Sequence, residues 1–128
     1  MKRSITFIIM ITLFILFGFT LYAKTHVLII GNGDYEDDAI RDLPGALEDT
    51  WKMKETLLQL EMAAEQDIRV VTNLPALNLK IVIREFLKQD YDKNDRLIFY
   101  YSGHGYSEEK HMENHTFLVP ANTREKYR

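Results

Sequence analysis

The sequence predicts an α/β domain built on a mostly parallel sheet. From Thr25 onward, short apolar runs that suit buried strands alternate with amphipathic runs that suit helices. The same region has few Pro or Gly residues, no low-complexity linker and no internal repeat, so we expect it to bury a core. Its length of about a hundred residues allows one domain at most.

The first 23 residues have the composition of a targeting segment. Lys2 and Arg3 precede an uncharged apolar stretch over residues 4–23, the layout of a signal peptide. Only the last residue of the closing Leu21-Tyr22-Ala23 is small, and at about 1.5 Å per residue the stretch could cross a ~30 Å hydrocarbon core. Residues 1–23 are therefore predicted to be a signal peptide or an N-terminal membrane anchor. The domain, residues 24–128, is predicted to be exported (periplasmic or extracellular) or membrane-anchored through residues 4–23.

The first predicted elements are a buried strand and a long helix. The continuous apolar run over residues 26–30 is typical of a strand covered on both faces, and Gly31-Asn32-Gly33-Asp34 ends it with turn-forming residues. A helix is expected from Pro44, whose fixed φ suits a first turn, to about Leu60. Its apolar stripe has helical spacing and comprises Ala46, Met53, Leu57 and Leu60.

The alternation then continues to the end of the domain. Residues 68–72 read as a second strand, and a second helix is predicted by a stripe of Leu79, Val82, Ile83, Phe86 and Leu87. A third buried strand over residues 97–101 runs into Ser102-Gly103-His104-Gly105, a polar loop follows, and a short strand over residues 116–119 stops at Pro120. The predicted order is β-α-β-α-β-β. Since catalytic groups of α/β folds usually follow the carboxyl ends of parallel strands, His104 lies where such a group is expected.

Charge and cysteine content exclude some functions. The formal net charge is −3, and it is more negative without Lys2 and Arg3, so no nucleic-acid partner is expected. The sequence contains no cysteine, and therefore no disulfide framework, thiolate nucleophile or thiolate metal ligand.

Several motifs together resemble one family. They are the strand ending in Ile30-Gly31-Asn32, the helix opening of residues 43–49, the Tyr-Tyr-Ser-Gly-His-Gly run of residues 100–105, and the Phe-Leu-Val-Pro run of residues 117–120. In this order they resemble the caspase and metacaspase superfamily of cysteine peptidases, most closely its bacterial members, over roughly residues 24–123. The resemblance implies a caspase-like α/β/α sandwich with a mostly parallel sheet, incomplete at its C-terminal side.

The resemblance also assigns roles to residues. It implies that His104 assists a cysteine thiolate and protonates the leaving amine, and that the Gly105 N–H is an oxyanion-hole donor. Gly103 is interpreted as a turn residue. Arg41, in the loop before the first helix, is a candidate substrate-binding residue because caspases place there an arginine that holds an acidic substrate residue.

The missing nucleophile leaves two functions open. In the family, a further helix and a strand ending in Asp-x-Cys would follow, so this chain is expected to be the N-terminal part of a cysteine endopeptidase domain that has the catalytic histidine without the nucleophile. The alternative is a non-catalytic interaction or regulatory module with the same fold. A peptide or protein substrate is expected for the first, and no cofactor for either.

Other kinds of site fit the sequence less well. Imidazoles and carboxylates gather in one segment, but they lack the His-Glu-x-x-His pattern, so no metal site is assigned to His104, Glu108, Glu109, His111 and His115. Gly31-Asn32-Gly33 follows a strand, but Glu36 occupies the third glycine position of a dinucleotide motif. An acidic loop without calcium-site spacing is interpreted as solvated and comprises Asp34, Glu36, Asp37 and Asp38.

A sheet that stopped at the third strand would leave that strand unpaired on one side. The strand over residues 97–101 is then expected to present an apolar open edge that aggregates or recruits another chain. The expected partners are therefore a complementing C-terminal segment or a second chain, with membrane contact only through the N-terminal segment.

Overall fold

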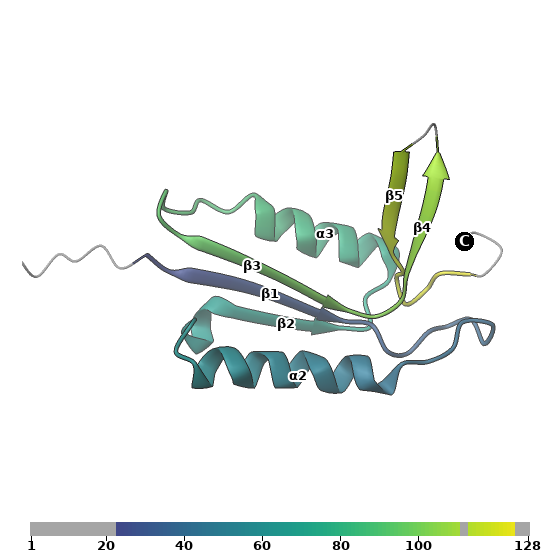
Figure 1. Cartoon of the computed structure of the whole chain (residues 1–128), viewed down its shortest axis with the longest axis horizontal. Helices are drawn as coiled ribbons and strands as arrows, with labels where there is room; N and C mark the ends of the chain where they lie inside the picture. The colour runs from purple at the N-terminus through teal and green to yellow at the C-terminus, as the bar shows by residue number, and fades with distance from the viewer. Residues whose placement is uncertain (1–22, 111–112, 125–128) are drawn as a thin grey trace, which may run out of the picture.

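The computed structural model describes residues 23–110 and 113–124, which form an α/β domain with a projecting hairpin (Figure 1). Its elements are β1 (Thr25–Gly31), α2 (Pro44–Gln59), the short 3-10 helix η1 (Glu65–Asp67), β2 (Ile68–Thr72), α3 (Ala76–Leu87), β3 (Arg96–Ser102), β4 (Gly105–Lys110) and β5 (Glu113–Leu118). The predicted leader lies, apart from Ala23, outside the described residues. Among the helices of the described ranges, none is long and apolar enough to cross a membrane.

The predicted parallel sheet is confirmed. β1 lies between β2 and β3 and pairs with both in parallel, giving the order β2-β1-β3. α2 covers one face of this sheet and α3 covers the other (Figure 1). With helices on both faces, the fold is the small α/β domain that the alternating pattern predicted, and its sheet of three strands is incomplete.

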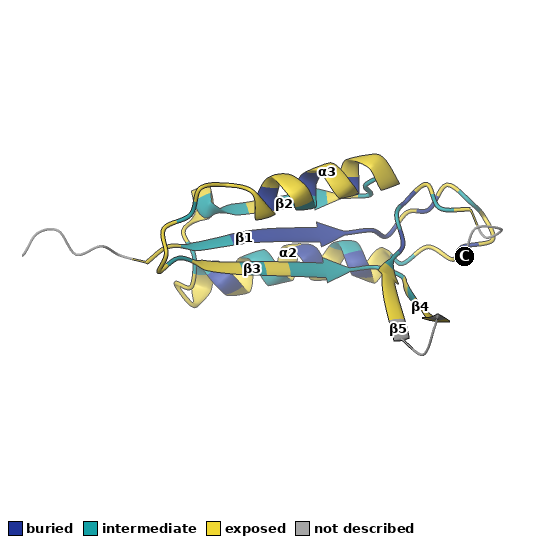
Figure 2. Ribbon diagram, turned by 90° about the horizontal axis from the view of Figure 1, so that it is seen from above, coloured by how far each residue is buried: buried dark blue, intermediate teal, exposed yellow. Residues whose placement is uncertain are grey.

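The apolar run of β1 forms the centre of both halves of the core. Its side chains alternate between the faces of the sheet, and Figure 2 shows β1 buried between its two neighbours. Val27 and Ile29 pack with Leu57 of α2. On the other face, Leu28 and Ile30 pack with the α3 residues Leu79, Val82 and Phe86. Burial on both faces explains why this strand has no polar alternation.

Three details differ from the sequence-based expectation. The segment predicted to be a polar loop forms β4, which pairs antiparallel with β5 in a separate two-stranded sheet. Leu60 was expected on the apolar stripe of α2, but it lies at the C-terminal cap, one residue past the helix, and is 63% exposed. Leu87, the last residue of α3, is 62% exposed because it borders a groove and not the core.

β3 exposes two large apolar side chains. Within the described residues it pairs only with β1, and Leu97 and Phe99 are 42% and 44% exposed. Phe99 is in register with Leu28, so both point to the α3 side of the sheet. On the α3 side there is also a groove of about 630 Å³ between α3 and β5, with an apolar lining that includes Ile83, Leu87 and Phe117.

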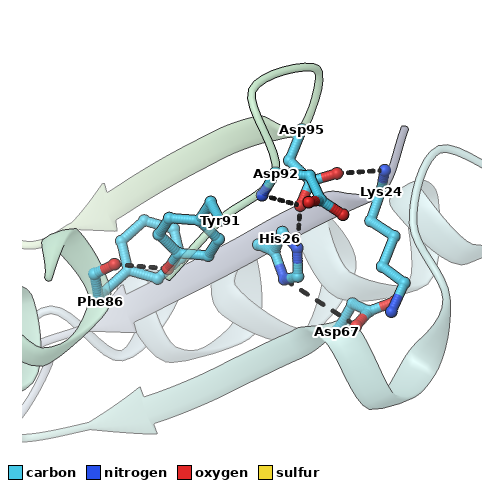
Figure 3. Close-up of polar contacts among 7 residues, drawn as sticks. All are labelled: Lys24, His26, Asp67, Phe86, Tyr91, Asp92 and Asp95. Atoms are coloured by element: carbon cyan, nitrogen blue, oxygen red, sulfur yellow. Dashed lines mark hydrogen bonds and ion pairs between the residues drawn. The ribbon is translucent and has the colours of Figure 1, made fainter. Parts of the chain in front are cut away.

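A polar cluster joins the elements at the amino end of the sheet (Figure 3). His26 Nε2 lies 3.1 Å from an Asp95 carboxylate oxygen, and His26 Nδ1 lies 3.9 Å from Asp67. The Asp95 carboxylate also accepts hydrogen bonds from the main-chain N–H groups of Lys24, at 2.8 Å, and Asp92, at 3.1 Å. Asp95 therefore ties the start of β1 to the turn before β3.

These hydrogen bonds are expected to make the stability of the fold depend on pH in the acid range. They hold the pKa of the Asp95 carboxyl below its ordinary value, the Lys24 N–H contributing most. A carboxyl with a lower pKa in the folded state stabilises the fold above the pKa of the unfolded chain, near 3.9, and this contribution is lost as the pH falls below it. Asp95→Asn is expected to be less stable than the wild type at pH 7, and the difference should shrink as the pH falls through 4.

Urea unfolding between pH 7 and pH 3 measures this difference. Asp90→Asn, in the same connection between α3 and β3, removes an exposed charge and controls for net charge. A stability difference between Asp95→Asn and the wild type that stayed constant over this range would contradict the prediction.

Candidate active site

The candidate site lies at the carboxyl end of the parallel sheet. The chain leaves β1 into a loop, residues 32–43, and leaves β3 at Gly103 and His104. From β1 the chain continues to β2 on one side of β1, and then crosses back to β3 on its other side. The direction of the strand order therefore reverses between β1 and β3. Crevices at such reversals are the usual ligand sites of open α/β sheets. The fold therefore brings the loop after β1 and the turn after β3 together where chemistry is expected.

Asn32 fixes this end of the sheet. It is fully buried, and its main-chain N–H donates to the Ser102 carbonyl at 2.9 Å. Its side-chain amide donates to the Val119 carbonyl at 3.1 Å and accepts from the Leu74 N–H at 2.9 Å. A single residue thus joins the ends of β1 and β3, the segment after β5 and the connection between β2 and α3.

Gly103 is needed because the chain runs close to a tyrosine. A Cβ at residue 103 would lie 2.7 Å from the Tyr101 hydroxyl and 3.0 Å from the Asn32 carbonyl oxygen. The Tyr101 hydroxyl shares its proton between the carbonyls of Val119, at 2.9 Å, and His104, at 3.1 Å. Burial raises the pKa of this phenol far above its ordinary value, with the neighbouring Tyr35 adding to the rise, so it remains a hydrogen-bond donor.

The His104 imidazole has one clear hydrogen-bond partner. Its Nε2 lies 2.7 Å from the main-chain carbonyl oxygen of Arg41. A carbonyl oxygen only accepts, so Nε2 must carry the proton, and in the neutral ring Nδ1 is then the basic nitrogen. This geometry selects the tautomer that can take a proton from a nucleophile placed at Nδ1.

The main chain of His104 is held on both sides. Its N–H donates to the Tyr35 hydroxyl at 2.9 Å, and the two rings lie 5.1 Å apart at 52°. Its carbonyl accepts from the Val119 N–H at 2.9 Å and from Tyr101. The imidazole therefore projects from a backbone whose position is fixed by three other segments.

Gly105 begins β4 and is exposed. The peptide between His104 and Gly105 is planar and trans, so its N–H points opposite to its carbonyl. Because Tyr101 and Val119 hold that carbonyl, the Gly105 N–H is directed away from them. A residue without a side chain at this point leaves room for a substrate carbonyl to approach.

The sequence also singled out Arg41 and an acidic loop. Arg41 is exposed, and its main-chain carbonyl binds the His104 imidazole. In the acidic loop, the carboxylate of Asp34 accepts from the Asn73 amide at 2.6 Å. A shallow pocket of about 320 Å³ is lined by Glu36, Asp37, Asp38 and Arg124.

The metal candidates can be located only in part. His111 lies outside the described residues, and Glu108 and His115 face each other in the β4–β5 hairpin. Over residues 23–110 and 113–124, no cluster of three or more His, Asp or Glu side chains could hold a metal ion.

Sequence reasoning missed the residues that hold His104 in place: Asn32, Tyr35, Asp42 and Tyr101. Asn32 and Tyr35 belong to a stretch that the sequence identifies only as a turn and an acidic loop. One signal was available in the sequence. The stretch contains an amide and a phenol side chain, and such side chains usually form hydrogen bonds when they are buried.

These features define a class of protein. A histidine of fixed tautomer at the carboxyl end of a parallel sheet, followed by a glycine N–H, has the geometry that a hydrolase with a nucleophile and a histidine requires of its acid–base group. Residues 24–127 match the family model described as the caspase domain, and the chain therefore belongs to the caspase domain family of cysteine peptidases. No curated protein matches the chain.

Proposed function

We propose that this chain supplies the histidine-bearing part of a caspase-like cysteine endopeptidase. The observation that carries the proposal is the hydrogen bond from His104 Nε2 to the Arg41 carbonyl, because it leaves Nδ1 as the base. In the proposed reaction, Nδ1 takes the proton of a cysteine thiol and the thiolate attacks the peptide carbonyl carbon. The imidazolium then returns the proton to the leaving amine, and water hydrolyses the thioester. The Gly105 N–H is the proposed donor to the oxyanion.

The nucleophile of this reaction must come from outside the given sequence, which contains no cysteine. We propose that it is brought by a segment consisting of a helix and a strand ending in Asp-x-Cys. The strand would pair with β3 along the edge that faces away from β1, at the end of which the chain turns through Gly103 and His104. A right-handed crossover from β3 to such a neighbour places its helix on the α3 face, where Leu97 and Phe99 are exposed. The exposed residues thus match the surface that this segment would cover.

The charges around the groove indicate what kind of helix fits. Three basic side chains border its apolar lining, two on α3 and one at its C-terminal cap: Lys80, Arg84 and Lys88. An amphipathic helix with an apolar stripe and acidic flanking residues would be complementary to this surface. Whether this complementing segment belongs to the same polypeptide or to a second chain, it needs the same apolar stripe, acidic flanks and cysteine.

A non-catalytic interaction module is the second candidate. It is favoured by the absence of cysteine together with the exposed apolar side chains of β3 and the groove. In this case the same surface would bind a partner that brings no nucleophile. The two candidates predict the same binding and different chemistry.

One experiment separates them. The full chain is coexpressed with a helix-and-strand segment ending in Asp-x-Cys, taken from a complete member of the family, and with the same segment carrying Ser for Cys. Copurification of both segments with hydrolysis only by the Cys form is the expected result. Copurification of both without hydrolysis would favour the interaction module, and failure of both to bind would contradict the proposed β3 pairing.

Two narrower proposals accompany this function. Arg41 is exposed and its carbonyl binds the His104 imidazole, and its side chain is proposed to bind an acidic group of the substrate. Residues 1–23 are proposed to export or anchor the domain, which would place its substrates outside the cytoplasm.

A further inference from the structure

Two contacts that define the state of His104 come from one loop. The His104 N–H donates to the Tyr35 hydroxyl at 2.9 Å, and His104 Nε2 donates to the Arg41 carbonyl at 2.7 Å. Both partners belong to the connection between β1 and α2, residues 32–43. The main chain and the imidazole of the histidine are thus held by the same segment, so the shape of that loop determines how His104 is presented.

Tyr35 is placed firmly enough to hold the histidine. Only 9% of its surface is exposed, and it packs with Ile40 and Val119. Its hydroxyl lies 3.0 Å from the Asn32 carbonyl oxygen. That carbonyl can only accept and the His104 N–H can only donate, so the Tyr35 proton points to Asn32 and its oxygen lone pair points to His104. The direction of each hydrogen bond is therefore fixed by chemistry.

Asp42 closes the loop on itself. Its carboxylate accepts a hydrogen bond from the Tyr35 N–H at 2.9 Å, seven residues away. Asp42 directly follows Arg41, so this bond fixes the peptide whose carbonyl binds the imidazole. The next residue, Leu43, donates its N–H to the Gly33 carbonyl at 2.7 Å and completes the closure. The bond between Tyr35 and Asp42 thus joins the residue that holds the His104 main chain to the neighbour of Arg41, whose carbonyl selects the tautomer.

We propose that Tyr35 and Asp42 are positioning residues for His104, acting together as a clamp that keeps its proton on Nε2. The proposal rests on the proposed function in one respect, since it takes His104 as the general base. Tyr35 acts on the histidine through its main chain and ring, and Asp42 acts through the Arg41 carbonyl. Neither residue needs to touch the substrate.

The test measures the tautomer of His104 in the full ¹⁵N-labelled chain at a pH where the ring is neutral. The nitrogen that carries the proton resonates well apart from the one that does not, so long-range ¹H–¹⁵N spectra give the ratio of the two tautomers. The wild type is expected to be almost entirely in the Nε2–H form. Tyr35→Phe and Asp42→Ala are each expected to lower the ratio roughly fivefold, the factor that one net hydrogen bond is worth.

A second readout follows the main chain. The His104 N–H loses its acceptor in Tyr35→Phe, so its hydrogen exchange is expected to accelerate by a similar factor, roughly fivefold. Amides in the middle of β1 should exchange at the wild-type rate. Asp42→Asn retains an oxygen that can accept from the Tyr35 N–H, so this variant should restore the wild-type tautomer ratio.

Tyr91→Phe is the matched control. Its hydroxyl donates to the Phe86 carbonyl at the opposite end of the sheet, so its loss removes a phenolic hydrogen bond without touching the loop (Figure 3). A wild-type tautomer ratio in Tyr35→Phe and Asp42→Ala would overturn the proposal, and so would an equal change in Tyr91→Phe. These readouts need no hydrolysis. A clamped His104 in a complemented protein without activity would refute the proposed function alone.

Discussion

Gly31→Ala is expected to destabilise the domain strongly, although it adds only one methyl group. Gly31 is the last residue of β1, where α2 passes close to the strand. A Cβ there would lie 2.1 Å from the Thr50 hydroxyl oxygen and 3.1 Å from the Ala46 carbonyl oxygen, and the first distance is impossible without movement. Gly31 is paired with both neighbouring strands, so the strand cannot move aside and α2 must. Overpacking of this kind costs about 1–3 kcal/mol.

Urea unfolding measures the loss, and α2 offers a matched control. An added Cβ at Gly45 would meet nothing within 4 Å, so Gly45→Ala should leave stability unchanged or raise it by up to about 1 kcal/mol. Thr50→Ala removes the hydroxyl that Gly31→Ala would strike, and the double variant should recover part of the loss. Full stability of Gly31→Ala, or identical losses in the single and double variants, would show that the close approach of α2 to β1 does not limit this position.

The parts of the fold that follow from local pattern could be predicted from the sequence. The continuous apolar run of β1 needs burial on both faces, and the apolar spacing around Val82 allows only a helix with one buried side. Pro44 marked the start of α2 because its ring fits the first turn. In each case the information lies within a few residues of the element itself.

The β4–β5 hairpin could not be predicted in the same way. β4 contains Ser107, Glu108 and Glu109, which are all exposed, so no side of the strand carries an apolar pattern. Its aromatic pair, Tyr106 stacked on Phe117 at 4.9 Å, joins residues from two strands and is invisible in either strand alone. Strand pairing in a projecting hairpin depends on such cross-strand contacts and not on burial in a core.

The candidate site divides along the same line. His104 and Gly105 could be singled out because their motif directly follows a strand and resembles the motif of a known family. Their supports, Asn32, Tyr35 and Asp42, act from a loop more than sixty residues earlier in the chain, as the separation of 69 residues between Tyr35 and His104 illustrates. Only the parallel pairing of β1 with β3 brings these segments together. Contacts made by long-range topology leave little trace in a single sequence, whereas residues beside their own strand do.

His104→Ala is expected to reduce hydrolysis by the complemented enzyme by orders of magnitude. In the proposed mechanism, the imidazole moves a proton between the nucleophile and the leaving amine at the carboxyl end of β3. Loss of a general acid–base group lowers kcat/KM by about 10²–10⁴-fold. The variant should still fold and still copurify with the complementing segment, because that segment is proposed to bind β3 and the groove, which do not include His104.

The control is His115→Ala, which removes an exposed imidazole from the hairpin and should keep wild-type kcat/KM. Steady-state hydrolysis of a peptide substrate, with the amount of bound complementing segment measured in the same samples, separates lost chemistry from lost assembly. Added imidazole is expected to restore part of the activity of His104→Ala, since a free base can enter the space that the side chain leaves. Wild-type activity in His104→Ala would remove this histidine from the mechanism, because a group that takes the proton of the thiol and returns it to the leaving amine cannot be dispensable.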